Sequence, residues 1–130
     1  MRTKIAVVLA GLGLLCSVVP VVAHHSVAGE YDVNKPVTIK GKVSRVDWTN
    51  PHSRIYVDVT DSGGKVTTWN FELAARSALT RQGWTGKSVK IGDTVTVEGD
   101  LARSGVNGGH ARTVVLADGS KVFSGANDNN

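Results

Sequence analysis

The amino-acid sequence predicts an all-β protein, a small OB-like barrel of five strands with one short helix between the third and fourth strands. Two observations support this fold class. Runs of alternating apolar and polar residues recur at short spacing from Val37 to Phe123, as in half-buried strands. After the third run, residues 77–82 break the alternation with residues typical of a helix. A β-sandwich or an SH3-like barrel is the alternative architecture.

The first expected strand is long and bent. Its apolar residues alternate from Val37 to Val43 and then resume at Val46 on the opposite parity. Because successive side chains of a strand point to opposite faces, this slip predicts a β-bulge at residues 44–45. The strand ends at residues 48–52 (WTNPH), a turn in which proline lacks an N–H donor and restricts the residue before it.

The next two strands form a hairpin. Residues 54–60 alternate with their aliphatic side chains facing the core, and 61–64 (DSGG) is a hairpin turn. In the third strand, residues 66–73, the aromatic residues share the core face and Glu72 lies on the other face. The hairpin therefore offers one apolar and one polar face.

The second half of the barrel begins with the helix. Ser77 is expected to cap its first turn, and Gly83 to follow its last residue. The later elements are a fourth strand at 94–101, a flexible glycine-rich loop at 104–109, a fifth strand at 111–116, a turn at 118–119 and a short strand ending at Phe123.

The N-terminus has the three parts of a secretory signal peptide. Arg2 and Lys4 precede an uncharged apolar stretch, and Pro20 and Ala23 mark its end and cleavage site. The competing interpretation is an uncleaved anchor, but residues 5–23 barely reach the roughly 18 residues that span a bilayer. We expect a periplasmic or secreted protein without stable membrane insertion, divided into a signal peptide (1–23), an N-terminal arm (24–36), the barrel domain (37–123) and a disordered tail (124–130).

Cleavage would change the composition of the chain. Cys16, the only cysteine, lies in the signal peptide, so the mature chain has no thiol for a disulfide or a nucleophile. Loss of Arg2 and Lys4 lowers the formal net charge of +4 by two, whereas nucleic-acid binders need a concentrated basic patch. The outer face of the second and third strands offers only Tyr56 for base stacking. We therefore expect no nucleic acid among the partners.

The sequence contains no signature of an enzyme. It has neither a nucleophile elbow nor a phosphate-binding glycine loop. Asp58 and Glu72 lie on the outer face of adjacent strands and form a possible carboxylate pair. Outward carboxylates are more often a solvated face, so we expect a protein without catalytic activity.

The four histidines are the strongest candidates for chemistry. His24 would be the first mature residue, so its α-amine and imidazole can chelate one metal ion as a pair. A further imidazole, from His25, His52 or His110, would complete a three-nitrogen site for copper, or a zinc site. The alternative is that the four are ordinary flexible, turn or strand residues.

The fold class places two of these histidines near a common ligand face. OB barrels bind ligands over strands two and three, between the loops that join strands one to two and four to five. The first loop carries Trp48 and His52, and the second carries Asn107 and ends at His110, while Tyr56 lies on the face itself.

Several segments of the mature chain resemble a family of small exported bacterial proteins of unknown function. The segments are AHHS (23–26), EYD (30–32), NKPVT (34–38), WTNPH (48–52), GW (83–84), GDTV (92–95) and ADG (117–119). The resemblance implies export and a small β-barrel, and it supplies no activity or catalytic residue. We therefore expect an exported binding module that binds copper or zinc through surface histidines, or alternatively an envelope protein-interaction domain without metal.

Overall fold

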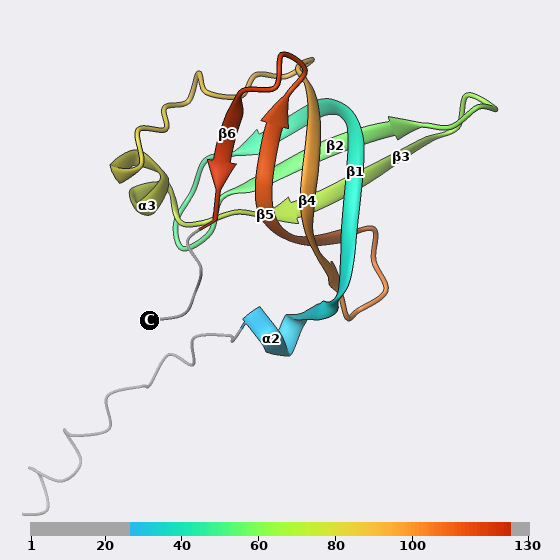
Figure 1. Ribbon diagram of the computed structural model, residues 1–130, viewed down its shortest axis with the longest axis horizontal. Helices are drawn as coiled ribbons and strands as arrows, with labels where there is room; N and C mark the ends of the chain where they lie inside the picture. The colour runs from blue at the N-terminus through green and yellow to red at the C-terminus, as the bar shows by residue number, and fades with distance from the viewer. Residues whose placement is uncertain (1–26, 126–130) are drawn as a thin grey trace, which may run out of the picture.

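The computed structural model describes residues 27–125 (Figure 1). The expected signal peptide, His24, His25 and most of the expected tail lie outside these residues. In the described part, no helix has the length and apolar character needed to cross a membrane. The elements are, in order, α2 (Val27–Glu30), β1 (Tyr31–Asp47), β2 (Arg54–Thr60), β3 (Val66–Glu72), α3 (Arg76–Arg81), β4 (Thr94–Ala102), β5 (Gly108–Leu116) and β6 (Lys121–Ser124).

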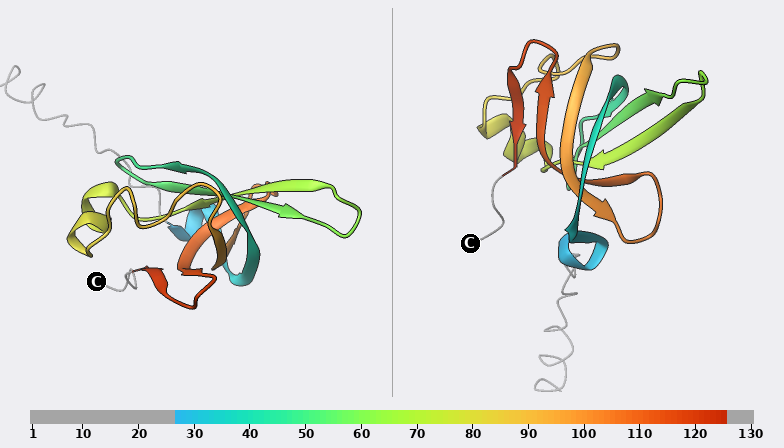
Figure 2. Two further views of the ribbon diagram at one scale, coloured as in Figure 1. Left: turned by 90° about the horizontal axis from the view of Figure 1, so that it is seen from above. Right: turned by 45° about the vertical axis from the view of Figure 1, so that its right-hand side comes forward.

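Five strands close into a ring, which confirms the OB-like all-β fold. β1 pairs with β2 and β4, β2 pairs with β3, and β4 pairs with β5, all antiparallel. A parallel pairing of β3 with β5 completes the ring, and β6 extends the sheet beyond β5. The view from above in Figure 2 shows the ring, with the β2–β3 hairpin reaching away from it. As expected, the one helix between strands three and four is short.

β1 is bent where the sequence predicts a bulge. Its register against β2 shifts between Val43 and Arg45, so one extra residue of β1 is accommodated there. The strand starts at Tyr31, earlier than the expected Val37, because Tyr31 pairs with Ala102 of β4. This early pairing brings the start of β1 to the same end of the barrel as the last residues of β4.

The glycine-rich segment before β5 is only partly a loop. Gly108 and Gly109, expected in a flexible loop, are the buried first residues of β5. A Cβ atom on Gly108 would lie 2.6 Å from the carbonyl oxygen of Asn70, and one on Gly109 would lie 2.5 Å from that of Asp100. The two glycines are therefore needed where three strands meet closely to close the ring.

An aromatic cluster covers one side of the barrel between α3 and β6. The rings of Trp48 and Trp84 stack with centroids 5.8 Å apart, and Phe123 meets Trp84 edge-on at 5.9 Å. Gly83 follows α3 with a φ of 90°, as expected for the residue after a helix. Ser77 is not the N-cap, since Ala75 holds that position without a side-chain hydrogen bond.

Candidate functional site

The β1–β2 loop is fixed by hydrogen bonds to the start of α3. The backbone N–H of Arg76 donates to the carbonyl oxygen of Thr49 at 3.0 Å. The N–H of Ser77 donates to Oδ1 of Asn50 at 3.2 Å. The loop thus supplies acceptors to the first turn of a helix that lacks a side-chain cap of its own. This anchoring holds the segment that carries His52.

His52 lies beside a buried carboxylate. Its side chain is 51% exposed, and its Nδ1 atom lies 3.3 Å from Oε1 of Glu72, whose side chain is only 7% exposed. The other oxygen of Glu72 accepts hydrogen bonds from the hydroxyl of Tyr31 and from Arg54, both at 2.9 Å. The two carboxylate oxygens of Glu72 thus face side chains from β1, from β2 and from the loop between them.

The placement of Glu72 differs from the expected solvated outer face. Glu72 does have the parity opposite to buried Phe71, but Tyr31 at the start of β1 bonds to it and shields it. It does not pair with Asp58, which instead accepts hydrogen bonds from Ser44 and Thr68. Asp58 and Glu72 therefore do not form the carboxylate pair that the sequence allowed.

The environment of Tyr31 keeps its hydroxyl in the neutral, donating form. Burial, followed by the hydrogen bond to Glu72 and the charge of that carboxylate, raises the pKa of Tyr31 to about 12. The Tyr31 ring also lies against His110, with ring centroids 5.5 Å apart. Tyr31 therefore contacts both Glu72 and His110.

His110 lies inside β5 and not at the end of a loop. It pairs with Asp100 of β4 on one side and with Glu72 of β3 on the other. Directly paired residues project from the same face of a sheet, so the three polar side chains form one row. Asp100 is buried too, its Oδ1 lies 3.5 Å from a guanidinium nitrogen of Arg112, and that oxygen has no hydrogen-bond partner among the described residues.

His52 and His110 line the same surface depression. Its volume is about 220 Å³, and its wall includes Val27, the first described residue. A second depression of about 180 Å³ shares Val27 and His52 and adds Glu72 and Arg54. Figure 1 shows α2, which begins at Val27, below this end of the barrel. Within residues 27–125, no three histidine, cysteine or acidic side chains are grouped to hold a metal ion.

The other expected ligand-face residues do not line the histidine depression. Trp48 stacks on Trp84, and Tyr56 lies under the Arg45 guanidinium, which is 4.5 Å from its ring centroid. Asn107 is exposed in the β4–β5 loop, where its carbonyl oxygen accepts the N–H of Asn70 at 3.0 Å. His52 and His110 thus line a depression that none of these three residues shares.

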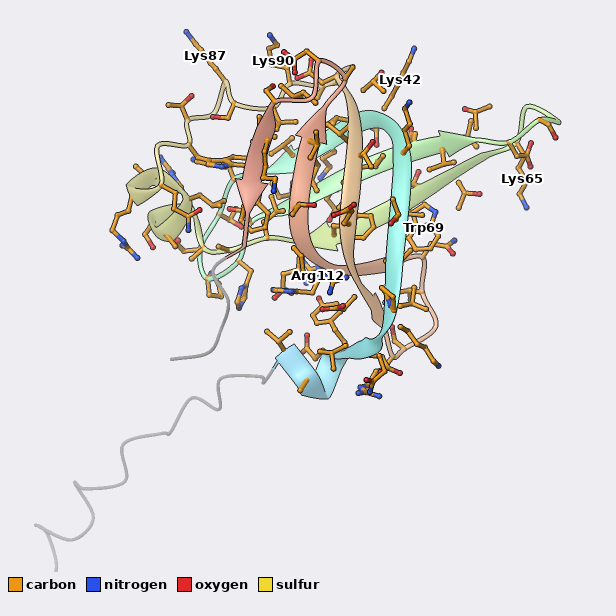
Figure 3. The ribbon with its side chains drawn as sticks, viewed as in Figure 1. Lys42, Lys65, Trp69, Lys87, Lys90 and Arg112 are labelled. Carbon is orange, nitrogen blue, oxygen red and sulfur yellow. The ribbon has the colours of Figure 1, made fainter. Side chains whose placement is uncertain are left out.

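Positive side chains are distributed unequally around this depression. Figure 3 shows Arg112 at the barrel end near α2, and Lys42, Lys87 and Lys90 at the opposite rim. Lys65 lies on the β2–β3 hairpin. A metal ion at the histidine depression would therefore not face this group of lysines.

A further cavity of about 440 Å³ is lined by Tyr31 and Arg54, which also bond to Glu72. Its second arginine, Arg103, lies 3.5 Å from an oxygen of Asp32. Each cavity arginine therefore has a carboxylate partner, since Arg54 bonds to Glu72. The cavity thus offers no excess of positive charge to an anionic ligand.

Sequence reasoning singled out the histidines but missed Tyr31 and Arg54, and it considered Glu72 only as a partner of Asp58 on a solvated face. Tyr31 falls in a segment without periodicity, Arg54 opens a strand, and Glu72 has the parity of a solvated residue. Arg54 and Glu72 are cross-strand partners in the β2–β3 hairpin, so the expected hairpin could have indicated that these two side chains lie close together. The contact with Tyr31 depends on pairing of β1 with β4, which no local pattern reveals.

The fold and this cluster define the protein as a small OB-like barrel with a histidine-bearing depression at one end. The chain belongs to DUF6152, a family of unknown function, which matches residues 10–111. No curated protein matches the chain. Among solved structures, the chain is similar to the mitochondrial single-stranded DNA binding protein Rim1 of S. cerevisiae, with 13% identity over 68% of this chain and 95% of that chain, at a TM-score of 0.49.

This similarity corrects one expectation. The exclusion of nucleic acid from the partners is withdrawn: the solved structure named above is that of a single-stranded DNA binding protein. The exclusion had rested on net charge and on a count of outward aromatic residues. At this level of identity the likeness concerns the fold, and fold alone assigns no ligand.

Proposed function

We propose that the exported mature protein is a non-catalytic module that binds Cu(II) at the histidine depression. The ligands are the α-amine and imidazole of His24 together with His52 and His110, with His25 as the alternative N-terminal ligand. The observation that supports this proposal is that His52 and His110, which are far apart in sequence, line one depression with Val27. Two segments that carry histidines thus meet at one end of the barrel, and the described part of the chain begins there with Val27.

Covalent geometry allows the N-terminal histidines to reach this depression. His24 and His25 lie outside the described residues and immediately precede Ser26 and Val27 in the chain. Three extended residues span at most about 11 Å. Because Val27 is part of the wall, the new N-terminus at His24 would lie within reach of both His52 and His110.

The donor atoms favour Cu(II) over Cu(I). Imidazole and amine nitrogens suit divalent copper, whereas Cu(I) is selected by thiolate and thioether sulfur. The only methionine is Met1 and the only cysteine is Cys16, and both lie in the expected signal peptide. The mature chain thus has no sulfur ligand, and Zn(II) is the main competitor.

Calorimetric titration of Cu(II) and Zn(II) tests the proposal. The mature protein with a free His24 terminus should bind one Cu(II) tightly, and a version extended at the N-terminus by Gly-Ser should bind it much more weakly. Electron paramagnetic resonance of the copper-loaded protein should show nitrogen ligands that decrease in number in His110→Gln. Equal binding by the free and extended forms would exclude the terminal chelate.

A second candidate function is docking to an envelope protein, and one observation favours it. β3 pairs with β5 only from Asn70 onward, so its first part has a neighbouring strand on one side only. Val66 in that part is 54% exposed. Such an edge can accept a strand of another protein. Recovery of a partner that is lost in Val66→Lys and is indifferent to metal would favour this function over copper binding.

A further inference from the structure

We propose that the end of the barrel opposite to the histidine depression is a docking surface for an anionic lipid bilayer. The surface consists of the exposed side chains of Lys42, Lys87, Lys90 and Ile91, which together form the lysine rim. The inference goes beyond copper binding, because none of these four residues lines the histidine depression.

Ile91 lies in a tight turn that is fixed to β1. The backbone N–H of Gly92 donates to the carbonyl oxygen of Val43 at 2.8 Å, and the N–H of Val43 donates to that of Asp93 at 2.9 Å. Within the turn, the N–H of Lys90 donates to Oδ2 of Asp93 at 2.9 Å. The Ile91 side chain is nevertheless 73% exposed. Because the turn is held in place, this apolar side chain leaves water only when another surface covers it.

The three lysines of the rim are available to an external partner. Their side chains are exposed, and none forms an ion pair with a carboxylate in the part of the chain that the structure describes. Figure 3 shows all three extending from the same end of the barrel. Four arginines differ, because each pairs with an acidic side chain of the fold: Arg45, Arg54, Arg103 and Arg112.

The charge near the rim is positive after its carboxylates are counted. Three carboxylates lie near it, and each already accepts a hydrogen bond: Asp58, Asp93 and Asp118. Two further exposed lysines lie near it as well, Lys40 on β1 and Lys121 at the start of β6. The five lysines therefore outnumber the three carboxylates.

A positive surface with one exposed apolar side chain fits an anionic bilayer. Each lysine near such a surface raises the affinity about fivefold by attraction to the headgroups. The apolar side chain then enters the boundary between headgroups and acyl chains. Single-stranded nucleic acid, in contrast, is bound by aromatic rings that stack on the bases, and the four rim residues include no aromatic ring.

Sedimentation of the mature protein with lipid vesicles tests the proposal, without added metal and at about 0.1 M salt, where charges more than about 10 Å apart are largely screened. Vesicles of equal parts phosphatidylglycerol and phosphatidylcholine should bind the protein at least about tenfold more tightly than vesicles of phosphatidylcholine alone. Binding to the anionic vesicles should weaken about fivefold or more in Ile91→Ser. It should weaken about tenfold or more when Lys87→Gln and Lys90→Gln are combined.

Two matched controls leave the rim intact. Val106→Ser removes an apolar side chain that is 60% exposed in the β4–β5 loop, at the other end of β4. Lys35→Gln combined with Lys65→Gln removes the same amount of charge as the double rim variant. Both controls should bind anionic vesicles as tightly as the unsubstituted protein.

Three outcomes would overturn the proposal. The first is failure of the unsubstituted protein to bind anionic vesicles, and the second is equal binding by the rim variants and their controls. The third is binding of a thymine oligonucleotide in place of vesicles, reduced by the lysine variant and not by Ile91→Ser. The two rim variants test the surface independently, so one suffices if the other fails to fold. Copper is absent throughout, so failure here leaves the proposed function standing.

Discussion

The two ends of the β1–β2 loop lie in opposite environments. Trp48 at the first end belongs to a stack of aromatic rings, with Trp84 parallel to it and Phe123 edge-on to Trp84. His52 at the other end is half exposed and faces a buried carboxylate that Tyr31 and Arg54 also bond. Five consecutive residues thus join an apolar cluster to a polar one.

The difference indicates which end of the loop stabilises the fold and which end has side chains available to a ligand. Burial of large aromatic side chains stabilises a small domain in proportion to the area removed from water. Buried charged groups contribute less to stability, because removing them from water offsets most of their attraction. We therefore expect the aromatic end to dominate unfolding experiments and the polar end to dominate binding experiments.

The largest expected effect on stability is at the aromatic end. Trp84 is 7% exposed, and Trp84→Ala would remove its contacts with both Trp48 and Phe123. The free energy of unfolding should fall by about 3–5 kcal/mol, measured by chemical denaturation. A loss below about 1 kcal/mol would contradict this prediction, because it would show that the aromatic stack contributes little to the free energy of unfolding.

The next largest effect is expected where the ring closes at the polar end. An alanine at Gly109 would place its Cβ atom 2.5 Å from the carbonyl oxygen of Asp100, a backbone atom that cannot move alone. Gly109→Ala should lower the free energy of unfolding by about 1–3 kcal/mol. Gly86→Ala is the control, because nothing lies within 4 Å of its added Cβ, and it should change stability by less than about 0.5 kcal/mol.

A smaller effect is expected from Tyr31, together with a dependence on pH. Tyr31→Phe removes the hydrogen bond to Glu72 and should cost about 1 kcal/mol near neutral pH. Because the folded-state pKa of Tyr31 is raised from 10.0 to about 12, its contribution is fully present below pH 10 and is lost as the pH rises through 12.

Denaturation curves at pH 9 and at pH 12 would measure this contribution. The stability difference between the unsubstituted protein and Tyr31→Phe should shrink at the higher pH. A difference that stays constant over this window would contradict a pKa of Tyr31 that burial and Glu72 raise on folding.

The smallest effect on stability is expected at His52. Its ring is half exposed, so His52→Gln should change the free energy of unfolding by less than about 0.5 kcal/mol. The same substitution should weaken Cu(II) binding by at least about tenfold, measured by calorimetry. A large loss of stability without any change in copper binding would show that His52 stabilises the fold and does not bind the metal ion.

Much of the fold could be predicted because its signals are local. The change of parity between Val43 and Val46 predicts the bulge that the register of β1 and β2 confirms. The glycine after the helix, Gly83, needs no distant partner to be recognised. The early start of β1 at Tyr31 could not be predicted, because it depends on pairing with Ala102 in a distant strand.

By itself, the sequence determined the order of the strands, the bulge, and which residue types were available for chemistry, because each depends on neighbouring residues. Only the tertiary structure decided which of them meet. His110 becomes a neighbour of Glu72 through the parallel pairing of β3 with β5, and Gly108 and Gly109 permit that approach because they lack Cβ atoms. Contacts across such a ring join positions that no local period connects, so His110 meets Glu72 only once the ring has closed.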